Sequence, residues 1–162
     1  MIDNNEINAI LSDYLSNERV QEMKRFVQHG SVSTYEHCLS VARLSYRIDR
    51  ALGQRCDPKV LLVGALLHDF YLYDWHDDDG GTHRLHGFRH AKTACLNARQ
   101  CFDIDEKTGR VIESHMWPLN PERVPPSREA WIVCVADKCI SLHETLFGRR
   151  PKKRGADGDS EA

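Results

Sequence analysis

Apolar residues along the chain recur every three or four positions, which predicts helices almost throughout and no convincing strand. A first helix is expected over residues 4–15 and a second over residues 18–28, before a break at Gly30 and Ser31. The apolar face of the second helix would consist of Val20, Met23, Phe26 and Val27.

The third predicted helix begins near Ser33 and stops at Gly53. Glu36 follows Ser33 by three residues, which is the spacing of a capping box. The stripe that should face the core consists of His37, Val41, Leu44, Ile48 and Leu52. A polar side chain therefore begins an inward-facing row.

The fourth predicted helix begins at Asp57-Pro58, with Asp57 as the cap and Pro58 in the first position. Residues 60–67 are apolar on every side, which predicts a helix buried at the centre of the domain. This helix ends by presenting His68 and Asp69.

Three further helices are expected, separated by a polar loop over residues 75–84 and a proline-rich connection. They should span residues 86–101, 106–115 and 128–147, the last capped by Ser127. The inner stripe of the last helix would be Ala130, Val133, Asp137 and Ile140.

The composition is that of a globular protein, with 162 residues, 41% of them hydrophobic and 28% charged. The net charge of −2 gives no overall attraction to nucleic acid or anionic membrane, and the basic run at 149–154 is interpreted as a solvated tail. The six cysteines form no CxxC pair, and no apolar leader follows the N-terminus, so we expect a cytoplasmic protein.

Titratable residues should face inward from three separate helices: His37, the pair His68-Asp69, and Asp137. Burying an unpaired carboxylate costs roughly several kcal/mol. Each residue alone could be a hydrogen-bonded histidine or half of an ion pair, but together they favour one shared partner. A divalent cation suits imidazole and carboxylate ligands.

The order of these residues resembles the HD superfamily of metal-dependent phosphohydrolases. The segments that carry the resemblance are YEHCLSVA (35–42), GALLHD (64–69) and VADK (135–138). The similarity covers about residues 33–146. It implies an all-α fold with a single HD-domain helical bundle of about six to seven helices over 31–147. Residues 1–30 would pack on it as N-terminal helices, and 148–162 would be a disordered tail.

His90 and His115 resemble two further histidines of an HD subgroup that holds two metals. Bacterial hydrolases of symmetrical dinucleoside tetraphosphates are similar, usually with a di-iron centre. The resemblance implies a first metal on His37, His68, Asp69 and Asp137. Asp69 would bridge to a second metal on His90 and His115. One or two divalent transition metals are expected, iron first, with manganese, zinc, cobalt and nickel left open.

The implied function is hydrolysis of a phosphoester or phosphoanhydride by a metal-activated water, on a small phosphorylated substrate such as a nucleotide or dinucleoside polyphosphate. Asp69, His86 and Lys138 are the candidate catalytic residues. His86, Arg89 and Lys138 are the candidate phosphate contacts. The aromatic segment 70–75 could wall the pocket, although it departs from relatives that carry a basic residue there.

Two other functions stay open on the sequence: an HD-type di-iron oxygenase and a non-catalytic nucleotide-sensing module. Nucleic acid and membrane partners are disfavoured, and a homo-oligomer is compatible with the sequence. His76 and His83 are not expected to be direct ligands, and His29 and His143 are interpreted as surface or packing residues.

Overall fold

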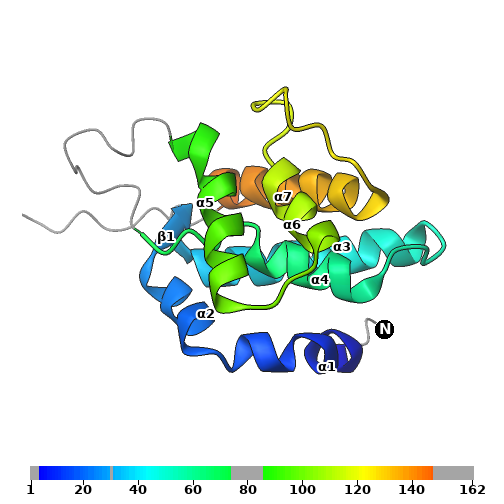
Figure 1. Cartoon of the computed structure of the whole chain (residues 1–162), viewed down its shortest axis with the longest axis horizontal. Helices are drawn as coiled ribbons and strands as arrows, with labels where there is room; N and C mark the ends of the chain where they lie inside the picture. The colour runs from blue at the N-terminus through cyan, green and yellow to red at the C-terminus, as the bar shows by residue number, and fades with distance from the viewer. Residues whose placement is uncertain (1–3, 30, 74–85, 148–162) are drawn as a thin grey trace, which may run out of the picture.

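The structure is a computed structural model that describes residues 4–29, 31–73 and 86–147. The described residues form a bundle of helices with one short two-stranded hairpin (Figure 1). The predicted all-α fold is confirmed. The elements are α1 (Asn4–Leu15), α2 (Glu18–Glu22), the 3-10 turn η1 (Met23–Arg25), β1 (Val27–His29), β2 (Val32–Ser33), α3 (Thr34–Ala51), α4 (Pro58–Leu67), α5 (His86–Cys101), α6 (Glu106–Ser114) and α7 (Arg128–Phe147).

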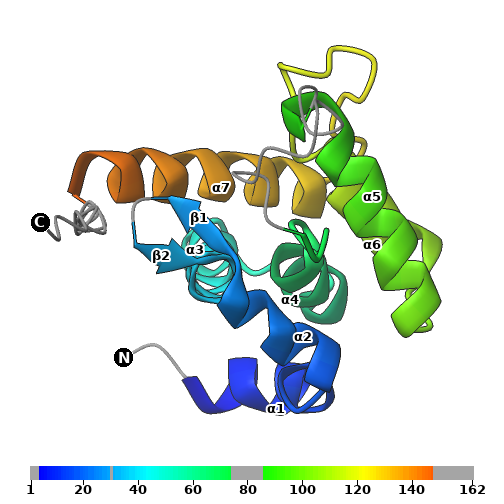
Figure 2. The same cartoon turned by 90° about the vertical axis from the view of Figure 1, so that its left-hand side faces the viewer.

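Helix α4 lies at the centre and contacts α1, α3, α5, α6 and α7. In Figure 2, α3 and α4 are seen nearly end-on, with α7 above them, α1 and α2 below, and α5 and α6 to one side. Residues 60–67 are all buried, as their unbroken apolar run predicts. Within the described ranges, no helix combines the length and apolar character needed to cross a bilayer.

The starts of three helices follow the predicted capping signals. Ser33 and Glu36 form both hydrogen bonds of a capping box at the start of α3. The Asp57 carboxylate accepts from the backbone N–H groups of residues 59 and 60 at the start of α4. The Ser127 hydroxyl accepts from the N–H of Ala130 in the first turn of α7. These caps fix where α3, α4 and α7 begin, and hence which of their residues face inward.

The second predicted helix is wrong in its C-terminal half, and so is the expectation of no strand. Helix α2 ends at Glu22, and after η1 the chain extends as β1, antiparallel to β2. The N–H of Thr34 donates to the carbonyl of Phe26 at 2.9 Å. Cross-strand pairing therefore replaces helical hydrogen bonds, and the β-branched Val27 and Val32 suit the extended backbone.

The predicted inner stripe of α3 is also wrong at its C-terminal end. Leu52 is 53% exposed and Ile48 is only partly buried. The face that packs against α4 and α7 instead carries small and polar residues such as Ala42, Ser45 and Asp49, all buried. Small side chains let the helices approach closely. Among the large apolar residues of α3, Val41 and Tyr46 are buried as well, whereas Leu44 and Ile48 are only partly buried.

The inner stripe predicted for α7 is buried or partly buried throughout.

Candidate metal centre

The structure gathers all six predicted metal ligands from five helices into one buried cluster. His37 lies in the first turn of α3, and His68 and Asp69 directly follow α4. The cluster is completed by His90 of α5, His115 at the end of α6 and Asp137 in the middle of α7. Residues separated by up to 100 positions in the sequence therefore share one site.

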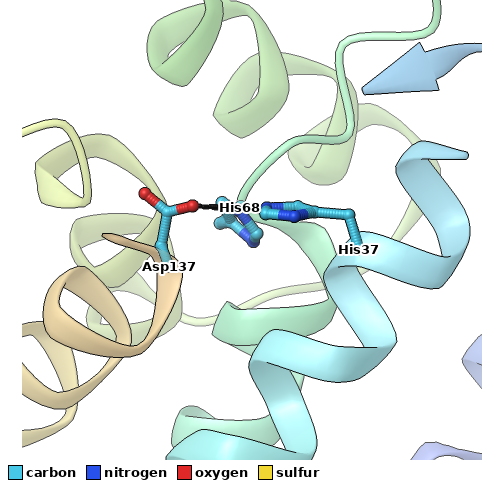
Figure 3. A group of neighbouring side chains, drawn as sticks. All are labelled: His37, His68 and Asp137. Atoms are coloured by element: carbon cyan, nitrogen blue, oxygen red, sulfur yellow. Dashed lines mark hydrogen bonds and ion pairs between the residues drawn. The ribbon is translucent and has the colours of Figure 1, made fainter. Parts of the chain in front are cut away.

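One half of the cluster is formed by His37, His68 and Asp137. Oδ1 of Asp137 lies 3.2 Å from Nε2 of His37 and 3.6 Å from Nε2 of His68. Figure 3 shows the three side chains pointing toward one another from α3, α4 and α7. Their ligand atoms all lie within 4.8 Å of one another, so the group can hold a metal ion.

Asp69 lies between this half and the other two histidines. Its Oδ2 is 3.4 Å from Nε2 of His68 and 3.9 Å from Nε2 of His37. Its Oδ1 is 3.2 Å from Nε2 of His90 and 3.5 Å from Nε2 of His115. The two histidines of the second half lie 3.0 Å apart, Nε2 to Nε2. The group of His68, Asp69 and His115 can also hold a metal ion.

Three of the histidines have their Nδ1–H engaged by an acceptor outside the cluster. Nδ1 of His68 donates to the carbonyl of Ala65, and Nδ1 of His115 to that of Ile112, each at 2.7 Å. Nδ1 of His37 donates to the carboxylate of Glu144 at 2.8 Å. Each bond fixes the ring and points its Nε2 atom into the cluster, which is how metal-binding histidines are oriented.

Two buried polar atoms of the cluster accept or donate no hydrogen bond among the described residues. They are Nε2 of His68 and Oδ1 of Asp69. Buried polar atoms are satisfied in the great majority of cases, so each such atom needs an explanation. A divalent cation would satisfy both, because an imidazole nitrogen and a carboxylate oxygen are ordinary ligands. The residues present therefore fit a metal centre.

The electrostatics of the cluster keep both carboxylates ionised. Burial alone would raise the pKa of Asp69, but the adjacent His68 and His90 hold it well below its usual range. Burial would likewise raise the pKa of Asp137, but its contacts with His37 and His68 hold it well below. Ionised carboxylates are the form that ligates a cation.

The pKa values of the histidines indicate that positive charge is favoured at His37 and His68 but not at His115. Burial lowers the pKa of His37, but hydrogen bonds to Asp137 and Glu144 outweigh it and raise the pKa to about 10. Burial lowers the pKa of His68, but the Asp69 charge and the contacts with Asp69 and Asp137 together outweigh it and hold the pKa well above its usual value. Burial and the nearby His68 lower the pKa of His115 to about 3, so that ring stays neutral.

Two residues that contact the cluster were missed from the sequence. Nε2 of Gln28, in β1, donates to Oδ2 of Asp69 at 2.6 Å, and Oε1 of Gln28 accepts from the Tyr71 hydroxyl. Gln28 was expected on a helix, so no signal pointed to it. Glu144 could have been found, because it extends the inner stripe of α7 one helical turn beyond Ile140.

Of the predicted phosphate contacts, Lys138 and Arg89 lie at the edge of the cluster, and the side chain of His86 is outside the described part of the structure. Nζ of Lys138 is 4.0 Å from Oδ2 of Asp137 and donates to the His115 carbonyl at 2.9 Å. Arg89 is exposed beside His90 on α5. His86 is the first residue of α5, and its side chain, like that of His29, lies outside the described residues, as do His76 and His83. His143 is exposed, as expected.

Comparison of the sequence with protein families shows which family the chain belongs to. Residues 34–142 match the HD domain family. The chain therefore belongs to the HD domain family, whose members generally are metal-dependent hydrolases. No curated protein and no solved structure was found that matches the chain. The match begins at the first residue of α3 and ends within α7, so it contains all six cluster residues.

Proposed function

We propose that this protein is a phosphohydrolase with two metals, acting on a phosphoester or phosphoanhydride of a nucleotide or dinucleoside polyphosphate. The position of Asp69 is the observation that carries the proposal. Its Oδ2 faces His37 and His68, while its Oδ1 faces His90 and His115. A carboxylate with one oxygen toward each of two histidine pairs is suited to bridge two cations.

The ligand assignment follows from these distances. His37, His68, Asp69 and Asp137 would hold the first cation, and Asp69, His90 and His115 the second. His68 is also a member of the second group of potential ligands, together with Asp69 and His115. Four imidazoles favour a transition metal over magnesium, and iron is the first choice among iron, manganese, zinc, cobalt and nickel.

When bound, a pair of divalent cations would supply a nucleophile from water at neutral pH and would neutralise the charge that develops on phosphoryl oxygens. The chain provides the rest. Asp69, fixed by the Gln28 amide, would orient the water, and neutral His115 keeps its lone pair available for coordination. Lys138, whose side chain is 43% exposed beside Asp137, would place a positive charge at the rim.

Arg89 and His86 are proposed as further phosphate contacts on α5. His86 lies one helical turn before His90, so the two residues share a face of the helix. Arg89 is next to His90 and exposed. Both would approach the substrate from α5, whereas Lys138 would approach it from α7.

The test is metal analysis of the purified full chain combined with a screen for phosphate release from nucleotides and dinucleoside polyphosphates. We expect bound transition metal, and loss of metal and of activity by at least about 100-fold in Asp69→Ala, which removes the shared ligand. Asp103→Ala, at an exposed aspartate outside the cluster, is the matched control and should keep both. An active Asp69→Ala protein without metal would refute the proposal. Oxygen consumption without phosphate release would instead support the oxygenase.

A further inference from the structure

Helix α7 is apolar on two opposite faces. The described domain buries one of them and leaves the other largely exposed, although the ring of Trp131 packs against that of Trp117, with centroids 4.9 Å apart. The inner face, with Ala130, Val133 and Ala136, is buried against the bundle. In Figure 2, α7 lies along one edge of the molecule, with α3 and the hairpin below it. The opposite face carries an outer stripe of Trp131 (39% exposed), Val135 (48%), Cys139 (exposed), Leu142 (61%) and Leu146 (64%).

The spacing of the outer stripe is that of a helix-packing seam. Successive members are four, four, three and four residues apart, so they keep to one narrow face over four turns. From Val135 to Leu142, and from Cys139 to Leu146, the interval is seven residues. A scattered exposed apolar residue needs no explanation, whereas a continuous row of this kind marks an interaction site.

The outer stripe is symmetric about its own centre, which is the reason to choose a second copy as its partner. Trp131 and Leu146 are its ends, Val135 and Leu142 are equally far from the middle, and Cys139 lies beside the midpoint. A two-fold axis near Cys139 would set Trp131 against Leu146, and Val135 against Leu142, of the other copy. A patch that complements itself in this way is what a two-fold interface requires.

We propose that the protein forms a two-fold dimer in which the α7 outer stripes of two copies pack antiparallel, with the axis near Cys139. The area of the outer stripe is sufficient for such an interface. Typical side-chain areas give the stripe on the order of 500 Å² of exposed apolar surface, so two copies would bury about 1,000 Å², which is the lower limit for a biological interface.

The charges around the outer stripe are compatible with this partner and orientation. Lys138 flanks the centre, but its Nζ bonds the carbonyls of His115 and Cys134, away from the stripe. Residues 148–162 contain no Leu, Ile, Val, Met or aromatic residue, so they offer nothing to cover the stripe themselves.

Sedimentation equilibrium of the full metal-loaded chain tests the proposal. We expect a dimer for the wild type and at least a tenfold weaker dimerisation in Leu142→Glu, which buries a charge in the seam. Leu96→Glu is the matched control, because Leu96 is 52% exposed on α5, away from the stripe, and it should leave the dimer intact. A monomeric wild type, or a dimer that survives Leu142→Glu, would overturn the proposal. So would a monomer that binds anionic vesicles through Leu142.

Cross-linking tests the position of the axis. Cys139 is the exposed cysteine of the six, so a short bismaleimide should link wild-type dimers but not Cys139→Ser dimers. In the Cys139→Ser background, Val135→Cys should link to Leu142→Cys when the two proteins are mixed, and not to itself. Self-linking of Val135→Cys alone would show a parallel pair and overturn the antiparallel arrangement.

Discussion

The surroundings of His37 are set by two carboxylates on the same helix. Asp137 and Glu144 are seven residues apart, which is two turns of α7, so both face α3. Glu144 accepts from Nδ1 of His37, while Asp137 lies against Nε2. One carboxylate thus fixes the ring, and the other is placed to share a cation with it.

Replacing Glu144 by alanine should weaken metal binding without removing a ligand. Loss of such a supporting carboxylate typically costs about 10- to 100-fold in metal affinity, because the ring is no longer held in place. Glu144→Gln should lose less, since the amide oxygen still accepts from Nδ1. Competition with a chromogenic chelator measures both affinities.

Glu122→Ala is the control for this prediction, because Glu122 is exposed and distant in the sequence from the cluster residues of α7. An unchanged affinity in Glu144→Ala would show that the hydrogen bond to His37 does not orient the ligand. Equal losses in Glu144→Ala and Glu144→Gln would show that charge rather than ring orientation matters.

The sequence alone predicts those cluster residues that lie on regular inward-facing stripes or at helix ends. His37 and Asp137 each sit in a row of apolar residues, and His68-Asp69 follows a fully apolar helix. Gln28 could not be found this way. Its contact with Asp69 joins positions 41 residues apart through a hairpin, and an exposed helical glutamine would look the same in sequence.

Among the elements, the contact between α4 and α6 controls the geometry of the cluster. Helix α4 leads into His68 and Asp69, and α6 leads into His115, so the separation of the two helices sets the separation of these ligands. The helices meet at Gly64. A Cβ there would lie 2.6 Å from Cγ1 of Val111, which is far inside contact distance.

Gly64→Ala should therefore destabilise the protein although alanine favours helix. Relieving the overlap with the branched and buried Val111 requires the helices to shift, and overpacking of this kind costs about 1–3 kcal/mol. Thermal unfolding of the metal-free protein measures the loss. Metal affinity should fall as well, because the shift moves His115 away from Asp69.

Gly109→Ala on α6 is the matched control for this substitution. The three nearest atoms to the added Cβ there belong to the flexible end of Arg99, which is 40% exposed, pairs with the exposed Glu106 and can shift while keeping that contact. Its helix propensity should then raise stability by up to about 1 kcal/mol. A Gly64→Ala protein at least as stable as the wild type would contradict the close approach of the two helices.

The elements also show where prediction from sequence stops. Caps at Ser33 and Asp57 give helix starts directly, because capping is a local interaction. The inner face of α3 was misjudged toward Leu52, since the closest packing uses small residues that carry little hydrophobic signal. The β1–β2 hairpin depends on pairing between segments, which overrides a helical spacing of apolar residues.

For the whole molecule, the cluster joins five helices at a single buried point. Helices α3, α5 and α7 and the residues that directly follow α4 and α6 each contribute at least one side chain, and all six side chains are buried. The apolar pattern was sufficient to predict a helical bundle. The meeting of these side chains was inferred from the cost of burying each one alone, and their pairing around Asp69 required the three-dimensional structure.

Because the cluster ties together the helices that make the core, metal binding should stabilise the entire fold. A ligand that binds only the folded state adds about 2.7 kcal/mol at a free concentration 100 times its Kd. We therefore expect the melting temperature to fall after chelation and to recover when a transition metal is added back. Asp69→Ala should show neither response, because it loses the ligand between the two histidine pairs, while Asp103→Ala should behave as the wild type. A wild-type melting temperature that does not respond to chelator or metal would mean that the buried carboxylates are balanced by protonated histidines alone.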